Sequence, residues 1–119
     1  MSDVVVTVPK SVWRAWLREG DLAGQAWGHG DAGQDGEYYF SVSSVPQIKP
    51  DERVYIVAYG KLRGYAPLVR VERRGRPALV RRGDAVAVTI PRAIPGFQGY
   101  RYRWWRREDE VAFPNWMKP

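Results

Sequence analysis

The chain has 119 residues, no cysteine and a formal net charge of +6. This length suits a single domain, and the hydrophobic share of 45% excludes a disordered chain. Without cysteine, disulfides and thiolate metal sites are excluded, and the apolar runs are too short to cross a bilayer, so we expect a cytoplasmic protein without membrane contact.

The first predicted elements are a strand and a helix. Residues 3–8 form a β-branched run that ends at Pro9, which suits the first turn of a helix better than a central strand. Apolar side chains recur at helical spacing over residues 10–19. Trp13 and Trp16 lie one turn apart in this helix, and we expect both in the core.

A glycine-rich segment, residues 20–36, predicts a long loop. Trp27 has no apolar companions there, and it either caps a bound base or sugar or folds back onto the barrel. His29 is the only histidine of the chain, so no second His or Cys completes a zinc set. We therefore expect His29 to be a solvated loop residue, and the protein to hold no metal or other cofactor.

The rest of the chain predicts short strands separated by Gly and Pro turns. Residues 53–59, RVYIVAY, are apolar on both faces and predict a central strand, and residues 60–64, GKLRG, predict the turn after it. The other predicted strands are residues 37–45, 65–73, 78–81, 85–90 and 100–106. A mostly β fold (α+β) with one or two short helices follows, in which residues 1–119 form one domain and a small bent sheet closes into a pseudo-barrel.

Three segments resemble the PUA-like superfamily, which includes PUA, ASCH, EVE and YTH domains. They are the early strand and helix that end in LREG, the hairpin RVYIVAYGKLRGYAPLVRVE, and the closing segment PGFQGYRYRWWRREDEVAFPNW. The resemblance implies a pseudo-barrel whose cleft between helix and sheet holds RNA or a modified base. The segment after the helix, GDLAGQAWGHG, lacks the Lys, Thr and Arg of many ASCH domains, so an ASCH-like catalytic activity is not implied.

The positive charge is concentrated in the second half of the chain. Residues 1–59 hold 5 basic against 8 acidic residues, a net of −3, whereas residues 60–119 hold 14 against 5, a net of +9. Of the 19 basic residues 15 are Arg, which grips phosphate with two parallel hydrogen bonds and stacks on rings. Either the partner is anionic, or Arg serves this protein simply as its solubilising cation.

The strongest candidate site is the run YRYRWWRR at residues 100–107. Alternation in a strand predicts one aromatic face, with Tyr100, Tyr102 and Trp104, and one cationic face, with Arg101, Arg103 and Trp105. Rings that stack on bases beside guanidiniums that pair with phosphates suit a single-strand or flipped-base binder. The alternative is that the rings fill the core and the arginines form a solvated outer face.

A second group of cations surrounds the predicted hairpin turn. Lys61 and Arg63 are expected to point outward there, either toward phosphate or as a soluble hairpin tip. A basic stripe is predicted beside it, at Arg70, Arg73, Arg74, Arg76, Arg81 and Arg82. The candidate nucleic-acid-binding residues are Trp27, Lys61, Arg63, Tyr100, Arg101, Tyr102, Arg103, Trp105 and Arg106.

The sequence favours a binding module for nucleic acid, RNA more than DNA, or for a modified nucleotide. A small hydrolase of a modified nucleoside is one alternative, with Lys61 and Glu72 as its candidate acid-base pair. A protein-interaction domain, whose partner surface is formed by Trp27 and the aromatic C-terminal residues, is another.

Overall fold

A computed structural model describes residues 2–18, 37–82 and 86–113 of the chain. Within these ranges the fold is mostly β with a single α-helix, as the sequence predicts. The elements are β1 (Val4–Thr7), α1 (Lys10–Arg18), β2 (Glu37–Ser41), β3 (Arg53–Ala58), β4 (Lys61–Arg74), β5 (Arg76–Arg82), β6 (Val88–Thr89), β7 (Tyr100–Tyr102), a 3₁₀ helix (Arg107–Asp109) and β8 (Val111–Ala112). The described part has no helix with the length and apolar character that a membrane span needs.

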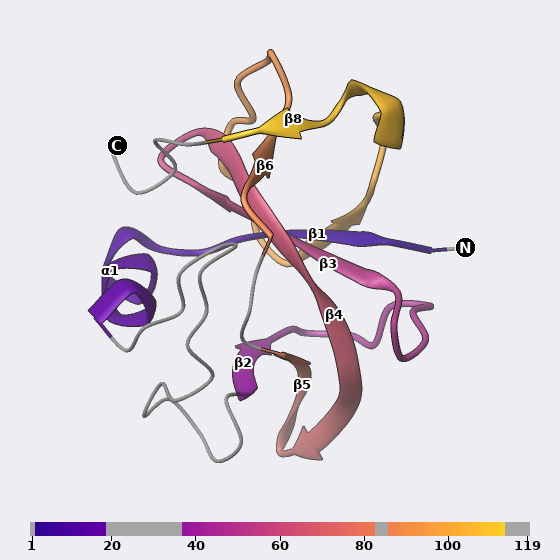
Figure 1. The fold of residues 1–119 in the computed structure, drawn as a ribbon. Coiled ribbons are helices and arrows are strands. Elements are labelled where there is room, and N and C mark those ends of the chain that lie inside the picture. The colour runs from indigo at the N-terminus through magenta and orange to yellow at the C-terminus, as the bar shows by residue number, and fades with distance from the viewer. Residues whose placement is uncertain (1, 19–36, 83–85, 114–119) are drawn as a thin grey trace.

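Six strands form one curled sheet in the order β2-β5-β4-β3-β1-β7, and β6 pairs with β8 in a small second sheet (Figure 1). β1 and β3 are parallel, with Val4 opposite Val54, while the other neighbours are antiparallel. α1 follows β1 directly and lies beyond its end (Figure 1). The result is a small β pseudo-barrel whose sheet has two edge strands, β2 and β7.

The central strands are buried on both faces because two hydrophobic cores flank the sheet. The helix-side core contains Val4 and Val6 of β1 together with Trp13 of α1. The C-terminal core, on the other face, contains Val5 and Trp105. Successive residues of a strand point to opposite faces, so this sandwiching explains the continuous apolar runs of β1 and β3. The predictions of a central strand, which as β3 ends at Ala58 rather than residue 59, and of a buried Trp13 are confirmed.

The hairpin between β3 and β4 turns earlier than the sequence predicts. Tyr59 and Gly60 both have positive φ, 53° and 71°, as the two central residues of a type I′ turn do. β4 therefore starts at Lys61, inside the predicted turn. Since Ile56 faces Gly64 and Val57 faces Leu62, Arg63 is the extra residue of a β-bulge.

Two predicted strands in the second half of the chain are much shorter than expected. Of the predicted strand at residues 85–90, the described residues 86–90 contain just β6 and an isolated bridge between Tyr65 and Val86. β7 ends at Tyr102, because its partner β1 starts at Val4 and the last ladder bond joins the N–H of Arg103 to the carbonyl of Asp3. The chain then leaves the sheet and covers the C-terminal core.

Gly64 gives a direct test of this packing. A Cβ at position 64 would lie 2.5 Å from the carbonyl oxygen of Val86, a backbone atom that the Tyr65–Val86 bridge holds in place. Gly64→Ala should therefore lower the free energy of unfolding by about 1–3 kcal/mol. Gly96→Ala is the matched control, since its Cβ would make an ordinary 3.6 Å contact with Thr7. Equal urea midpoints for the two variants would contradict the packing at Gly64.

Candidate functional site

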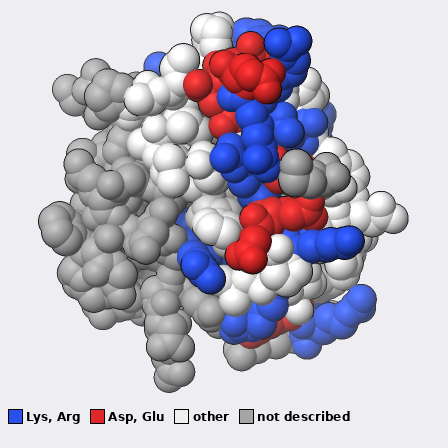
Figure 2. All heavy atoms as spheres, turned by 45° about the vertical axis from the view of Figure 1, so that its right-hand side comes forward, with Lys and Arg blue, Asp and Glu red and all other residues white. Residues whose placement is uncertain are grey.

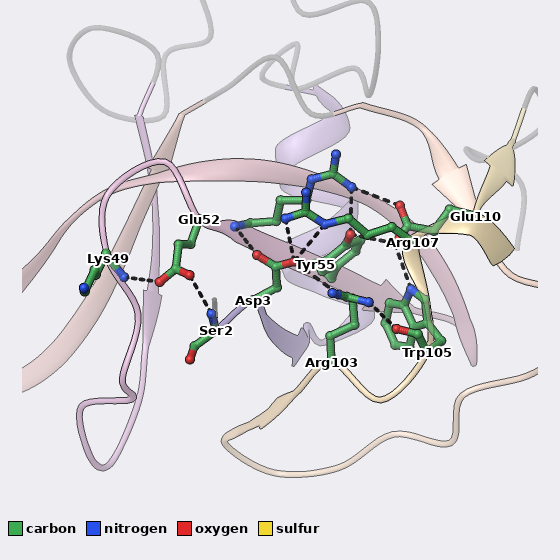
Figure 3. A network of polar contacts seen from close by, with 10 residues as sticks. Ser2, Asp3, Lys49, Glu52, Tyr55, Arg103, Trp105, Arg107 and Glu110 are labelled. Carbon is green, nitrogen blue, oxygen red and sulfur yellow. Dashed lines mark hydrogen bonds and ion pairs between the residues drawn. The ribbon is translucent and has the colours of Figure 1, made fainter.

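Asp3 is the centre of a buried polar network that binds the end of the chain to the sheet (Figure 3). Its carboxylate accepts a hydrogen bond from the N–H of Arg53 at 3.0 Å, from Arg103 Nε at 3.1 Å and from Arg107 Nη2 at 2.9 Å. Burial alone would raise the pKa of Asp3, but the hydrogen bonds from Arg53, Arg107 and Arg103 outweigh it and lower the pKa. The guanidinium of Arg103, a predicted phosphate ligand, is thus held by Asp3.

Glu110 is the second carboxylate of this network, and Figure 3 shows it beside Tyr55, Arg107 and Trp105. It accepts hydrogen bonds from the Tyr55 hydroxyl at 2.6 Å, from Trp105 Nε1 at 2.9 Å and from Arg53 at 3.1 Å. Burial, followed by the bond to Glu110, raises the pKa of Tyr55. We call Asp3, Arg53, Tyr55, Arg103, Trp105, Arg107 and Glu110 the clasp.

The clasp corrects the two-faced ligand strand predicted for residues 100–106. Trp105 is 3% exposed and packs edge-on against Tyr55 in the C-terminal core, so its ring faces are closed to a base. Tyr100 packs against the helix-side core. Tyr102 is 45% exposed, and its hydroxyl accepts a hydrogen bond from the N–H of Gln47.

The cations of the same segment are divided among different roles. Arg106 is exposed and pairs with Glu108 at 3.1 Å. The guanidinium of Arg101 lies 4.6 Å from the centroid of the Phe97 ring, and among the described residues it makes no ion pair. Figure 2 shows a face on which Lys and Arg form a band interrupted by Asp and Glu. Since Arg103 and Arg107 pair with Asp3 and Arg106 pairs with Glu108, the arginines of residues 100–107 do not form one open cationic face.

The structure also corrects the expectation that Arg63 points outward. As the bulge residue it is fully buried, and its Nε donates a hydrogen bond to the carbonyl of Ala58 at 2.9 Å. Burial lowers the pKa of Arg63. Lys61 is exposed, as expected.

The suggested acid-base pair is separated by the length of β4. Lys61 is its first residue, whereas Glu72 lies near its far end and pairs with Arg70 at 2.7 Å. The structure does not bring Lys61 and Glu72 together (Figure 1). Trp27 and His29 lie outside the described residues.

A cavity lies where the two edges of the sheet approach each other. Residues 40–43, at the end of β2, form one wall, and residues 97–99, just before β7, form another. Thr7, Pro9 and Arg76 complete the lining, and the volume is about 490 Å³. We call it the seam cavity. This volume is within the range of pockets that bind small ligands.

The side chains around the seam cavity favour a flat, anionic ligand. Phe40 and Phe97 are half-buried, since Phe40 packs against the helix-side core and Phe97 against the C-terminal core, and the rest of their surface lines the cavity. Arg76 is exposed, while no Asp or Glu is among the described lining residues. The hydroxyl of Thr7 is buried and has no hydrogen-bond partner among the described residues. Of the residues that line the seam cavity, only Arg76 could be singled out from the sequence. The other lining residues come from distant segments of the chain, and no local pattern brings them together.

A slightly larger hollow of about 520 Å³ lies near Ser2, residues 46–49 and Glu52. The backbone N–H groups of Ser2 and Lys49 donate to the carboxylate of Glu52, and these bonds lower the pKa of Glu52 (Figure 3). A carboxylate that stays charged repels anions, so this hollow suits an anionic ligand less well than the seam cavity does.

Comparison of the chain with protein-family models, with curated proteins and with solved structures finds no match. Within residues 2–18, 37–82 and 86–113, no group of three or more His, Asp and Glu side chains is placed to hold a metal ion. No relative therefore indicates a ligand for the seam cavity, and its lining residues are the guide to what it can bind.

The clasp predicts how stability depends on pH. The folded-state pKa of Asp3 is lowered, so its stabilisation is complete above the unfolded-state pKa of about 3.9 and is lost as the pH falls through the folded-state value. Asp3→Asn should cost about 1–3 kcal/mol of unfolding free energy at pH 7. The difference in unfolding free energy between Asp3→Asn and the unsubstituted protein should shrink below about pH 4. Urea unfolding at several pH values measures this difference.

Glu108→Gln is the control for this experiment, because the Glu108 side chain is 72% exposed and pairs with the exposed Arg106. Surface pairs of this kind contribute at most about 1 kcal/mol. A loss on Asp3→Asn that stayed constant from pH 7 to pH 2 would contradict the ionised, clasped Asp3.

Proposed function

We propose that the protein is a nucleic-acid-binding module that holds an unstacked base, with its phosphate, in the seam cavity. The observation that carries the proposal is the seam cavity itself, in which two aromatic side chains and an exposed arginine line the opening between the sheet's edge strands. Bases stack on aromatic rings for roughly 1–3 kcal/mol each, and guanidinium groups pair with phosphate oxygens.

Phe97 is the expected stacking residue of the seam cavity. The guanidinium carbon of Arg101 lies 4.6 Å from the centroid of the Phe97 ring, so a ligand that reaches Phe97 also meets a nearby positive charge. Arg76 supplies a second cation to the lining. Stacking between a ring and flanking arginines is how proteins recognise single strands with little sequence preference.

A single-stranded partner suits this site better than a duplex. A base inside a duplex is already stacked and paired, and extruding it costs a few kcal/mol, whereas an unpaired base enters a cavity freely. Protein modules that read RNA mostly bind such unpaired bases. We therefore propose single-stranded RNA as the main partner, and a PUA-like origin of the domain is part of the same proposal.

The first test separates stacking from general hydrophobic contact. Phe97→Leu keeps an apolar side chain in place but removes the aromatic face. Its affinity for a labelled single-stranded RNA decamer should fall about five- to 150-fold, the equivalent of 1–3 kcal/mol. Fluorescence anisotropy at low salt measures the affinity, and thermal melting shows that the variant remains folded.

Trp104→Leu is the matched aromatic control, since Trp104 is 49% exposed and lies outside the seam cavity. Arg76→Gln and Arg106→Gln form a second pair, of which only the first should weaken binding and flatten its salt dependence. If the unsubstituted protein did not bind the decamer, or if Trp104→Leu weakened binding as much as Phe97→Leu, the proposal would be wrong.

A further inference from the structure

A third hollow lies beside the hairpin of β3 and β4. It has a volume of about 340 Å³, and its lining includes the exposed cations Lys61 and Arg92 and the ring of Phe113. Residues 89–91 and Ala93 form its apolar wall. We call it the turn pocket. Its described lining holds no acidic residue.

Tyr59, at the tip of the same hairpin, is surrounded by further cations. Lys10 Nζ lies 5.2 Å from the ring centroid, and Arg14 Nε donates to the hydroxyl at 2.9 Å. The buried Arg63 lies 5.5 Å from the ring centroids of both Tyr59 and Phe113, so it connects this group to the turn pocket. Five cations and two rings thus form one continuous group.

Four cations of this group have no acidic partner in the part of the chain that the structure describes. Among the described residues, Lys10, Arg14, Lys61 and Arg92 make no ion pair with Asp or Glu. Other arginines of the protein are paired with carboxylates, namely Arg53, Arg70, Arg103, Arg106 and Arg107. The positive potential is therefore expected to be strong at the β3–β4 turn, rather than at residues 100–107.

One loop connects the turn pocket to the seam cavity. Arg92 and Ala93 line the turn pocket, and Phe97 lines the seam cavity. The loop is held to the hairpin between them, since the N–H of Ile94 donates to the carbonyl of Gly60 at 2.8 Å. The four-residue step from Ala93 to Phe97 spans at most about 14 Å, which an extended single strand can cross.

We infer that the turn pocket is a phosphate subsite for the strand whose base occupies the seam cavity. Lys61 and Arg92 contact a backbone phosphodiester, while Arg63 adds positive charge from beneath the ring of Phe113. The ligand is then a single strand that crosses residues 91–99, and a free mononucleotide fills only the seam cavity. This inference rests on the proposed function and names its substrate as an oligonucleotide.

The test compares a strand with a single nucleotide. The double variant Lys61→Ala/Arg92→Ala should weaken binding of the RNA decamer and lower the slope of log affinity against log salt by about 1.4, or 0.7 for each lost contact on a single strand. Its affinity for AMP, measured by calorimetry, should stay within about twofold of the unsubstituted protein, because AMP does not reach the turn pocket. Lys49→Ala/Arg106→Ala is the control with the same loss of charge at exposed positions away from the turn pocket.

The outcomes distinguish this inference from the proposed function. If Phe97→Leu weakens binding of the decamer but Lys61→Ala/Arg92→Ala does not, the phosphate subsite is wrong and the seam cavity stands. If the salt slope falls equally for both double variants, the turn pocket attracts RNA only through general charge, and the subsite is wrong. The subsite is also wrong if Lys61→Ala/Arg92→Ala weakens AMP binding as much as decamer binding. If the unsubstituted protein binds neither ligand, the proposed function itself fails.

Discussion

The ion pairs of Asp3 with Arg103 and Arg107 are the interaction on which the architecture depends. They join residues about 100 positions apart in the chain, and the Asp3 side chain is only 1% exposed. Because β7 has just three residues, its own ladder is too short to hold the C-terminal segment firmly. The clasp begins at the next residue and fixes β7 as an edge of the sheet. Residues 97–99, one wall of the seam cavity, lead directly into this anchored strand.

Much of the fold can be predicted from local patterns. α1 (Lys10–Arg18) follows from its spacing of apolar residues, and β3 (Arg53–Ala58) from its continuous apolar run, since each pattern reflects nearby contacts. The turn at Tyr59 is harder, because a bulky residue rarely takes positive φ. The bulge that buries Arg63 depends on the register between two strands, which no local pattern specifies.

The candidate site could be predicted only in part, because it depends on pairings between distant residues. The run YRYRWWRR does alternate, but which of its arginines are open to a ligand depends on carboxylates elsewhere. Asp3 and Glu110 hold Arg103, Arg107 and Trp105 inside the clasp. Lys10 and Arg92, which no motif marks, have no acidic partner within residues 2–18, 37–82 and 86–113. Composition predicts the excess of positive charge, whereas its location follows from these ion pairs.

The curled sheet thus has two different candidate binding surfaces. The seam cavity lies at its open side, and the turn pocket lies beside the β3–β4 hairpin. Two phenylalanines and an arginine line the seam cavity, and the turn pocket holds cations around the ring of Phe113, with residues 91–99 between them. Together they account for a basic protein whose C-terminal arginines are mostly paired. In the proposed function a base enters the opening between β2 and β7, which a closed barrel would lack.

The central claim is that the opening between the edge strands receives a base. The most direct measurement is a titration of the ¹⁵N-labelled protein with AMP, followed by the amide signals in NMR spectra. The account predicts that the amides of residues 41–43 and 97–99 shift first and saturate together. Shifts confined to residues 102–106, with those around the seam cavity unmoved at saturation, would contradict it.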